Sequence, residues 1–209
     1  MKSQMKVAIV TIALAMAATT AWALKVGSAA PDFSGKDSHG KTQTLSQYRG
    51  KFVVLEWTNH DCPYTKKHYE SGNMEALQKK WTERGVIWLS IISSAPGKEG
   101  FMTATEENQY LAKMHASLTA VILDTSGQIG HLYEAKTTPH MFVIDPTGKL
   151  IYEGAIDDHP AVYDSPAQTV ALIKSAKNYV DEALGQAMAG KPVTDPVTRP
   201  YGCSVKYGE

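Results

Sequence analysis

The sequence predicts an α/β domain with a mixed central sheet flanked by helices, preceded by a hairpin and followed by an extension. Two observations predict this class. Short apolar runs rich in β-branched residues alternate along the chain with segments of helical periodicity. Near the end, a four-residue turn joins two strand-like segments directly, so the last pair of strands is expected to be antiparallel. A chain of 209 residues suits one such domain and a short tail.

Residues 1–23 have the pattern of a secretory signal peptide. Lys2 and Lys6 precede an apolar run over 7–18, and Ala21-Trp22-Ala23 has the small-x-small order of a signal peptidase site. The run is too short for a membrane span, which needs about 20 residues. We therefore expect cleavage after Ala23, export to the periplasm or out of the cell, and no stable membrane insertion afterwards. An N-terminal membrane anchor is the alternative.

The charge balance bears on the class of partner. The chain has 21 basic and 21 acidic side chains, and removal of the two N-terminal lysines leaves 19 against 21. Such a protein has no strong positive field to attract nucleic acid or an anionic membrane. Nucleic acid is therefore not expected as a partner.

The first predicted elements are a hairpin and a central strand. Gly40 lies between short polar, alternating segments in the loop-rich stretch 30–51, as in a hairpin. The apolar run 51–57 predicts the strand at the centre of the sheet. Glu56 interrupts this run, so a carboxylate is expected in the interior, where burial raises its pKa. A strand-end position that reaches solvent or a lysine is the alternative.

Cys62 lies where this strand gives way to a helix that begins at about Pro63. Residues 71–73 break the helix, and Asn73 is expected to cap a second helix that Gly85 ends. The apolar stripe of this second helix is Met74, Leu77 and Trp81. A thiol at a helix start faces unpaired backbone N–H groups and the positive end of the helix dipole, and both stabilise the thiolate. Redox chemistry at Cys62 is the first functional hypothesis.

Strands and helices continue to alternate in the second half. The apolar run 86–93 predicts a strand buried on both faces, and 119–124 predicts the next strand. Between them, Thr103 and Glu106 have the spacing of a capping box at the start of a helix. A short helix is expected at 128–134.

A turn and a long helix are expected to complete the domain. Asp145-Pro146-Thr147-Gly148 has the residues of a type I turn, so the strand 149–156 should return antiparallel to 140–145. Ser165 and Pro166 predict the start of one continuous helix. The expected apolar face of this helix is Val170, Ile173, Ala176, Val180 and Leu184.

The tail carries the second of the two cysteines. We expect the domain to cover 24–190, and three prolines exclude helix from the tail 191–209, which also lacks a strand pattern. Two cysteines in an exported chain suggest a disulfide between Cys62 and Cys203. Such a bond would close about 140 residues and stabilise the fold by about 5 kcal/mol. A redox-active pair, a permanent structural disulfide and two independent thiols all remain open at this point.

Several motifs in order resemble the thioredoxin-like superfamily, and within it the peroxiredoxin-like branch related to alkyl hydroperoxide reductase and thiol-specific antioxidant proteins. The motifs are APDF, Gly40-Lys41, Leu45-Ser46, Tyr48-Arg49-Gly50-Lys51, Trp57, Cys62-Pro63, Thr138-Pro139 and FVIDPTGKLIYEG. The resemblance covers about residues 29–190 and extends to the closing motifs IDD, AGKPV and YGCSVKY. It implies a thioredoxin-like mixed sheet and an antioxidant or thiol redox function.

The resemblance also implies roles for particular residues. Cys62 matches the attacking cysteine, and Glu56 matches a buried acid that holds or releases the proton. Pro139 matches a cis-proline, although a trans proline at a strand start is the alternative from the residues alone. Thr138 would offer backbone hydrogen bonds to a bound peptide or mixed disulfide.

Two positions depart from the family pattern. Thr65 stands where a thioredoxin has its second cysteine, so the resolving thiol must come from Cys203 or from another protein. Asn59 stands where a typical peroxiredoxin has a threonine that positions peroxide, which favours disulfide exchange or a binding role. Thr65 and Lys66, in the first turn of the helix, are expected to border the substrate site and tune the thiolate.

The sequence therefore predicts an exported thiol-disulfide oxidoreductase in which Cys62 attacks a disulfide or a peroxide and Cys203 resolves it, with an unidentified thiol as electron donor. No cofactor or metal is expected. One alternative is a redox-inert binding module with a structural disulfide. Another is a copper carrier in which His60, Cys62, His140 and Cys203 converge on the metal.

Overall fold

The computed structural model describes residues 24–162 and 165–208, and the predicted signal peptide, residues 1–23, lies outside them. Five strands form the central sheet in the order β5-β4-β3-β7-β8. These strands are β3 (Val53–Trp57), β4 (Ile87–Ile92), β5 (Ala120–Leu123), β7 (His140–Ile144) and β8 (Leu150–Gly154). β3, β4 and β5 are parallel, whereas β7 is antiparallel to both β3 and β8. The predicted mixed sheet with β3 at its centre is confirmed.

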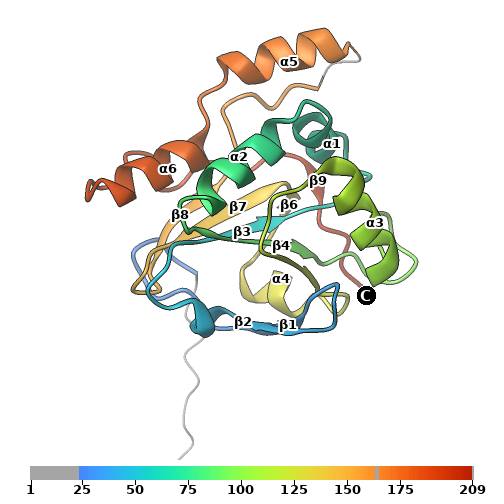
Figure 1. The fold of residues 1–209 in the computed structure, drawn as a ribbon, viewed down its shortest axis with the longest axis horizontal. Helices are drawn as coiled ribbons and strands as arrows, with labels where there is room; N and C mark the ends of the chain where they lie inside the picture. The colour runs from blue at the N-terminus through green and yellow to red at the C-terminus, as the bar shows by residue number, and fades with distance from the viewer. Residues whose placement is uncertain (1–23, 163–164, 209) are drawn as a thin grey trace, which may run out of the picture.

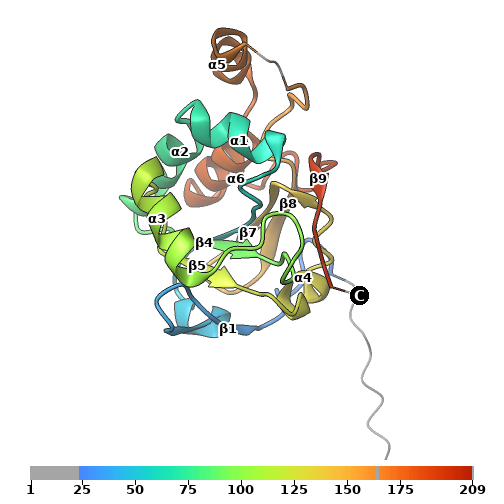
Figure 2. The same cartoon turned by 90° about the vertical axis from the view of Figure 1, so that its right-hand side faces the viewer.

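Two layers cover the faces of the sheet (Figure 1). On one face lie α1 (Pro63–Glu70), α2 (Asn73–Thr82) and α6 (Tyr179–Met188), with α3 (Ala104–Met114) beside them. The other face carries α4 (Gln128–Leu132) and the hairpin of β1 (Ser34–Lys36) and β2 (Thr42–Thr44), which the 3₁₀ helix η1 (Leu45–Tyr48) follows. Alternate residues of β3 enter different cores, since Leu55 packs on the hairpin side and Val54 on the helix side. Figure 2 shows the same layers from the side.

Local signals place most element ends as predicted. The side chains of Thr103 and Glu106 form the capping box that begins α3. The break between α1 and α2 also occurs where expected, but Gly72, in the left-handed conformation, is the cap of α2. Asn73 is instead the first residue of the helix, and its amide contacts Nδ1 of His68 at 2.9 Å. The prediction that Asn73 is the cap was therefore wrong by one residue, because glycine adopts the positive φ at this corner.

The last predicted helix is two helices, α5 (Pro166–Ser175) and α6. The chain between them returns to the sheet, where the N–H of Tyr179 donates to the carbonyl of Ile156 at 3.0 Å. Asn178 then caps α6, and its side chain accepts from the N–H of Asp181 at 2.8 Å. The apolar face that the sequence predicts is therefore divided: Val180 and Leu184 are buried in the core, whereas Val170 and Ile173 are half-buried on α5, which projects from the body (Figure 1).

The tail also differs from its prediction. Two of its residues form a strand, β9 (Cys203–Ser204), that pairs antiparallel with β6 (Thr137–Thr138). A strand of two residues has no periodicity for a sequence pattern to reveal, and its partner lies far away in the chain. Among the helices of the described residues, none has the length and apolar character to cross a membrane.

Because α6 begins at its own cap, Asn178, a substitution there should destabilise the protein. Replacing the cap Asn178 by Ala removes the hydrogen bond to the N–H of Asp181 and should lower the free energy of unfolding by about 1 kcal/mol, measured by urea denaturation. Lys174→Ala, on the exposed side of α5, is the control and should change it little. In one continuous helix Asn178→Ala would stabilise the protein, because Ala has the higher helix propensity.

Candidate active site

Cys62 is the N-cap residue of α1, directly after the loop that leaves the central strand. Its N–H donates to the carbonyl of Asn59 at 3.1 Å, and its own carbonyl accepts from the N–H of Lys66 at 2.9 Å, which begins the helix. Pro63 occupies the first turn, where its missing N–H costs nothing. No acidic side chain lies in this first turn, so none repels a negative sulfur there. The Cys62 side chain is fully buried.

The Thr138-Pro139 loop lies against the sulfur. The peptide bond between these residues is cis, as the family resemblance implies. β7 begins directly after it, with His140 paired opposite Trp57 at the end of β3. This register brings the loop beside the start of α1, and the Cys62 thiol donates to the carbonyl of Thr138 at 3.1 Å.

Cys203 reaches the same place from the tail. It pairs with Thr138 across β6 and β9, and its N–H donates to Sγ of Cys62 at 3.4 Å. The two cysteines are not bonded to each other in the structure. The fold therefore brings together the only two thiols of the chain, which lie 141 positions apart.

The neighbours of the two thiols shift their pKa values in opposite directions. Burial by itself would raise the pKa of Cys62, but hydrogen bonds from the side chains of Cys203 and Thr138 and from the backbone N–H groups of Cys203 and Thr65 lower it below its usual value. Burial, followed by the hydrogen bond to Cys62 and its negative charge, raises the pKa of Cys203 to about 12. Cys62 is thus the more acidic thiol of the pair, and it loses its proton before Cys203 does.

Glu56 is buried as predicted, but it faces the helix side of the sheet. Its carboxylate accepts hydrogen bonds from four side chains, none of which is Cys62. The donors are Tyr69 at 2.9 Å, Gln78 at 3.3 Å, Trp88 at 2.7 Å and Ser90 at 2.9 Å. Burial raises the pKa of Glu56, although these donors oppose the rise. The structure therefore does not place the carboxylate in direct contact with the sulfur.

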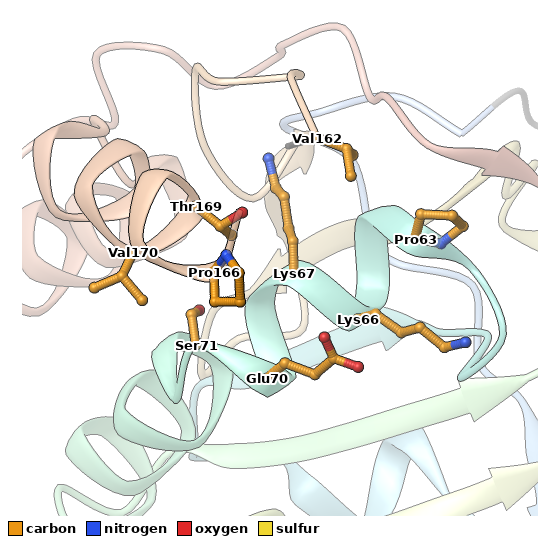
Figure 3. A pocket seen from close by; sticks show the side chains of 9 residues that line it. All are labelled: Pro63, Lys66, Lys67, Glu70, Ser71, Val162, Pro166, Thr169 and Val170. Atoms are coloured by element: carbon orange, nitrogen blue, oxygen red, sulfur yellow. The ribbon is translucent and has the colours of Figure 1, made fainter. Parts of the chain in front are cut away.

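The two predicted residues of the first helical turn differ in their environment. Thr65 is fully buried, and within the described residues its hydroxyl has no hydrogen-bond partner. Lys66 is exposed and, with Pro63, lines a pocket of about 200 Å³ between α1 and α5 (Figure 3).

Residues that hold the tail belong to the site and were not predicted from the sequence. The hydroxyl of Tyr201 donates to the carboxylate of Asp157 and lies 3.3 Å from Nε2 of His68. Its ring packs 5.9 Å from Tyr64 and lies under the ammonium of Lys67 at 4.8 Å. The closing motif YGCSVKY was the one signal that could have indicated a docked tail.

The histidines of the copper alternative make other contacts. His60 is hydrogen-bonded to Glu107 at 2.7 Å and stacks on Tyr110 at 3.8 Å. Nδ1 of His140 accepts from the N–H of Lys136 at 3.3 Å, and burial lowers the pKa of His140 to about 3. Across residues 24–162 and 165–208, no three His, Cys, Asp or Glu side chains are arranged to share a metal ion. The geometry gives the copper carrier no support.

Comparison with known proteins places this chain in a family. The model of the AhpC/TSA family matches residues 26–153. The chain is 29% identical over 127 residues to the thiol-disulfide oxidoreductase ResA of Bacillus subtilis (strain 168), a match that covers 60% of this chain and 64% of that protein. It therefore spans just under two thirds of that relative. With ResA of Bacillus cereus (strain ATCC 10987 / NRS 248) it shares 30% over 130 residues, covering 62% and 69%.

Solved structures show the same fold. An uncharacterized conserved protein from Geobacillus kaustophilus superimposes with a TM-score of 0.73 at 18% identity, covering 88% of this chain and 93% of that one. A candidate thiol:disulfide interchange protein DsbE from Chlorobium tepidum does so with a TM-score of 0.52 at 26% identity, covering 78% and 100%. From the matched family model, the mixed sheet and the cysteine beside a cis-proline, we conclude that the chain belongs to the AhpC/TSA family and has the thioredoxin-like fold.

Proposed function

We propose that this protein is an exported thiol-disulfide oxidoreductase in which Cys62 attacks the disulfide of a substrate protein and Cys203 resolves the product. The observation that carries this proposal is the placement of the Cys203 N–H 3.4 Å from Sγ of Cys62. The names of the ResA and DsbE relatives support the reaction class. Export rests on the signal-peptide pattern of residues 1–23.

In the first step Cys62 acts as a thiolate, which the backbone N–H of Thr65 at the helix start stabilises. Its thiolate attacks one sulfur of the substrate disulfide, and the other substrate sulfur leaves as a thiolate that takes up a proton. Cys62 then carries a mixed disulfide and no charge. The carbonyl of Thr138 and the cis peptide bond that follows it border the sulfur at this stage.

The second step depends on the changed charge at Cys62. While Cys62 is a thiolate, its charge helps to hold the proton on Cys203. Capture of Cys62 in the mixed disulfide removes this charge, so the Cys203 thiol loses its proton more readily. The Cys203 thiolate then attacks Sγ of Cys62, forms the Cys62–Cys203 disulfide and releases the reduced substrate. A thiol donor completes the cycle by reducing this disulfide.

Glu56 is proposed as the proton acceptor, acting through the interior rather than by contact with the sulfur. Its raised pKa supports this role, since an acid with a pKa nearer neutrality exchanges protons at working pH. Tyr69 is the hydrogen-bonded neighbour that links Glu56 to α1, the helix that Cys62 caps.

A peroxide is the second candidate substrate. The hydroxyls of Thr58 and Thr65 are buried without a hydrogen-bond partner among the described residues, on either side of Cys62 in the sequence. Either hydroxyl offers a donor for a peroxide oxygen. In this case the Cys62 thiolate would become a sulfenic acid, which Cys203 would convert to the disulfide with loss of water.

Trapping distinguishes these reactions. With a protein disulfide as substrate, Cys203→Ser should accumulate a mixed disulfide at Cys62, seen by non-reducing electrophoresis and mass spectrometry, while Cys62→Ser should give none. Sulfenic acid at Cys62 of the Cys203→Ser variant at low peroxide would assign the peroxide reaction instead.

A permanent structural disulfide predicts a third outcome: a Cys62–Cys203 bond with a reduction potential below about −300 mV would contradict an oxidoreductase.

The pKa of Cys62 should depend on the hydrogen bond that it receives from the side chain of Cys203. In Cys203→Ala that donor is lost, so the pKa of Cys62 should rise toward the value of about 8.5 for an unperturbed thiol. Cys203→Ser keeps a hydroxyl donor and is the matched control, with a lower pKa. The ultraviolet absorbance of the thiolate, followed against pH, gives both values. Equal midpoints in the two variants would show that the side chain of Cys203 does not stabilise the thiolate.

The proposed role of Glu56 predicts a change in the pH profile of exchange. Glu56→Gln removes the ionisable group, so its inflection should disappear from the profile and the rate should fall about 100-fold. Ser90→Ala removes one donor from the carboxylate, and its inflection should move to higher pH because the charged form loses support. Identical profiles for Glu56→Gln and the parent protein would exclude Glu56 from proton transfer.

A further inference from the structure

The tail covers the sulfur that the proposed function requires to be reactive. The side chain of Cys62 is 0% exposed. Its neighbours include Cys203 and the carbonyl of Thr138, and β9 and β6 are paired directly beside it. A disulfide in a folded partner therefore has no path to Cys62 while β9 is in place.

The same strand occupies the backbone edge beside the cis peptide bond. Thr138 pairs with Cys203 and Thr137 with Ser204, in antiparallel register. An extended segment from another protein that carries a cysteine to Cys62 would need this edge for its own pairing. The tail and such a segment are therefore alternative occupants of β6.

The tail is anchored on both sides of Cys203. On the N-terminal side, Tyr201 is held by Asp157 and His68. On the C-terminal side, the ring of Tyr207 stacks on His131 at 4.0 Å, and its hydroxyl donates to the carbonyl of Ala135 at 2.8 Å. Between the anchors, the pairing of β9 with β6 and two further backbone hydrogen bonds hold the tail: the N–H of Val205 donates to the carbonyl of Lys136 at 3.2 Å, and the carbonyl of Lys206 accepts from the N–H of Ala95 at 2.9 Å. Loss of an anchor removes the side-chain part of this hold, so the tail should leave its place more often.

Gly202, the residue directly before Cys203, shows that the edge of β6 leaves no room for a side chain at this position. Its φ of +137° lies in the region that side chains disfavour. A Cβ at this position would lie 2.1 Å from the carbonyl oxygen of Thr138 and 2.8 Å from its carbon. Both atoms are backbone and belong to β6, so neither can turn aside. A residue with a side chain cannot occupy this place while the strand remains paired.

We infer that β9 is an exchangeable strand that occupies the substrate edge, and that a partner replaces it with an extended cysteine-bearing segment whose residue before the cysteine is glycine. The ring of Tyr201 packs against Tyr64 and Lys67, so we also expect the partner to have an aromatic residue directly before its glycine. This inference rests on the proposed function: Cys62 attacks the partner while the tail is displaced, and Cys203 resolves the mixed disulfide when the tail returns to β6. It adds that the tail closes the site against proteins, and that the order aromatic-Gly-Cys selects among them.

Access to Cys62 tests the closing role without any need for turnover. In a Cys203→Ser background, a polyethylene-glycol maleimide reports how fast Cys62 becomes accessible to a bulky reagent. Adding Gly202→Ala should displace β9 and raise the labelling rate about tenfold or more. Gly208→Ala is the matched control, because its Cβ would make only an ordinary contact of 3.5 Å with Ala95. Tyr207→Ala, which removes the second anchor, should also speed labelling and serves if Gly202→Ala does not fold.

A pair of peptides tests the glycine. The peptides YGCSVKY and YACSVKY are prepared as mixed disulfides with thionitrobenzoate and added to the full chain carrying Cys203→Ser and Tyr207→Ala. Attack by the Cys62 thiolate forms a bond to the peptide sulfur and releases the coloured thionitrobenzoate anion, which gives the rate. The glycine peptide should react about tenfold faster, whereas free cysteine, as the control nucleophile, should treat the two peptides alike.

The outcomes separate this inference from the proposed function. Equal labelling of Cys62 in the Cys203→Ser protein with and without Gly202→Ala or Tyr207→Ala would overturn the closing role, even if disulfide exchange is observed. Equal rates for the two peptides would overturn the glycine requirement. Conversely, fast labelling with no disulfide exchange would leave the exchangeable strand intact and contradict the oxidoreductase.

Discussion

The antiparallel pairing of Thr138 with Cys203 is the interaction on which the site depends. It fixes the second cysteine over the first, excludes solvent from Cys62 and directs a backbone N–H to the sulfur. Each effect follows from placing a strand beside the cis peptide bond, where the carbonyl of Thr138 already faces the sulfur. Without this pairing, the first turn of α1 would still stabilise the Cys62 thiolate through the N–H of Thr65. The hydrogen bonds from Cys203 would be lost.

The pairing also shifts the pKa values of two chemically identical side chains in opposite directions. Cys62 receives hydrogen bonds from the helix start and from the tail, so its charged form is favoured. Cys203 is partly buried on β9 and lies beside the negative charge of Cys62, so its neutral form is favoured. The two ionisations are linked, because capping either sulfur removes the interaction that shifts the other. In the proposed mechanism, this coupling lets attack by Cys62 precede resolution by Cys203 without a further base at the tail.

Glu56 is a carboxylate in the interior of the fold, where burial of a charge is unfavourable. A buried carboxylate is tolerated only with hydrogen bonds, and here donors from α1, α2 and β4 converge on it from Tyr69, Gln78, Trp88 and Ser90. The cluster therefore ties the helix that Cys62 caps to the sheet beneath it. In this arrangement the structural and the proposed proton-transfer roles of Glu56 share one set of contacts, and the pH profile rather than stability distinguishes them.

The elements whose causes are local could be predicted from the sequence. The buried strands, the Thr103 capping box, the turn at 145–148 and the placement of Cys62 at a helix start all follow from residues within a few positions of one another. Family resemblance added the cis peptide bond at Thr138-Pro139.

Two features follow only from contacts between segments far apart in the chain. The final helix divides because Tyr179 is drawn back to Ile156 in the sheet. The tail forms a strand because Thr138 offers it an unpaired edge. In each case the deciding contact joins residues far apart in the chain, and such a contact leaves no pattern in the sequence around either partner.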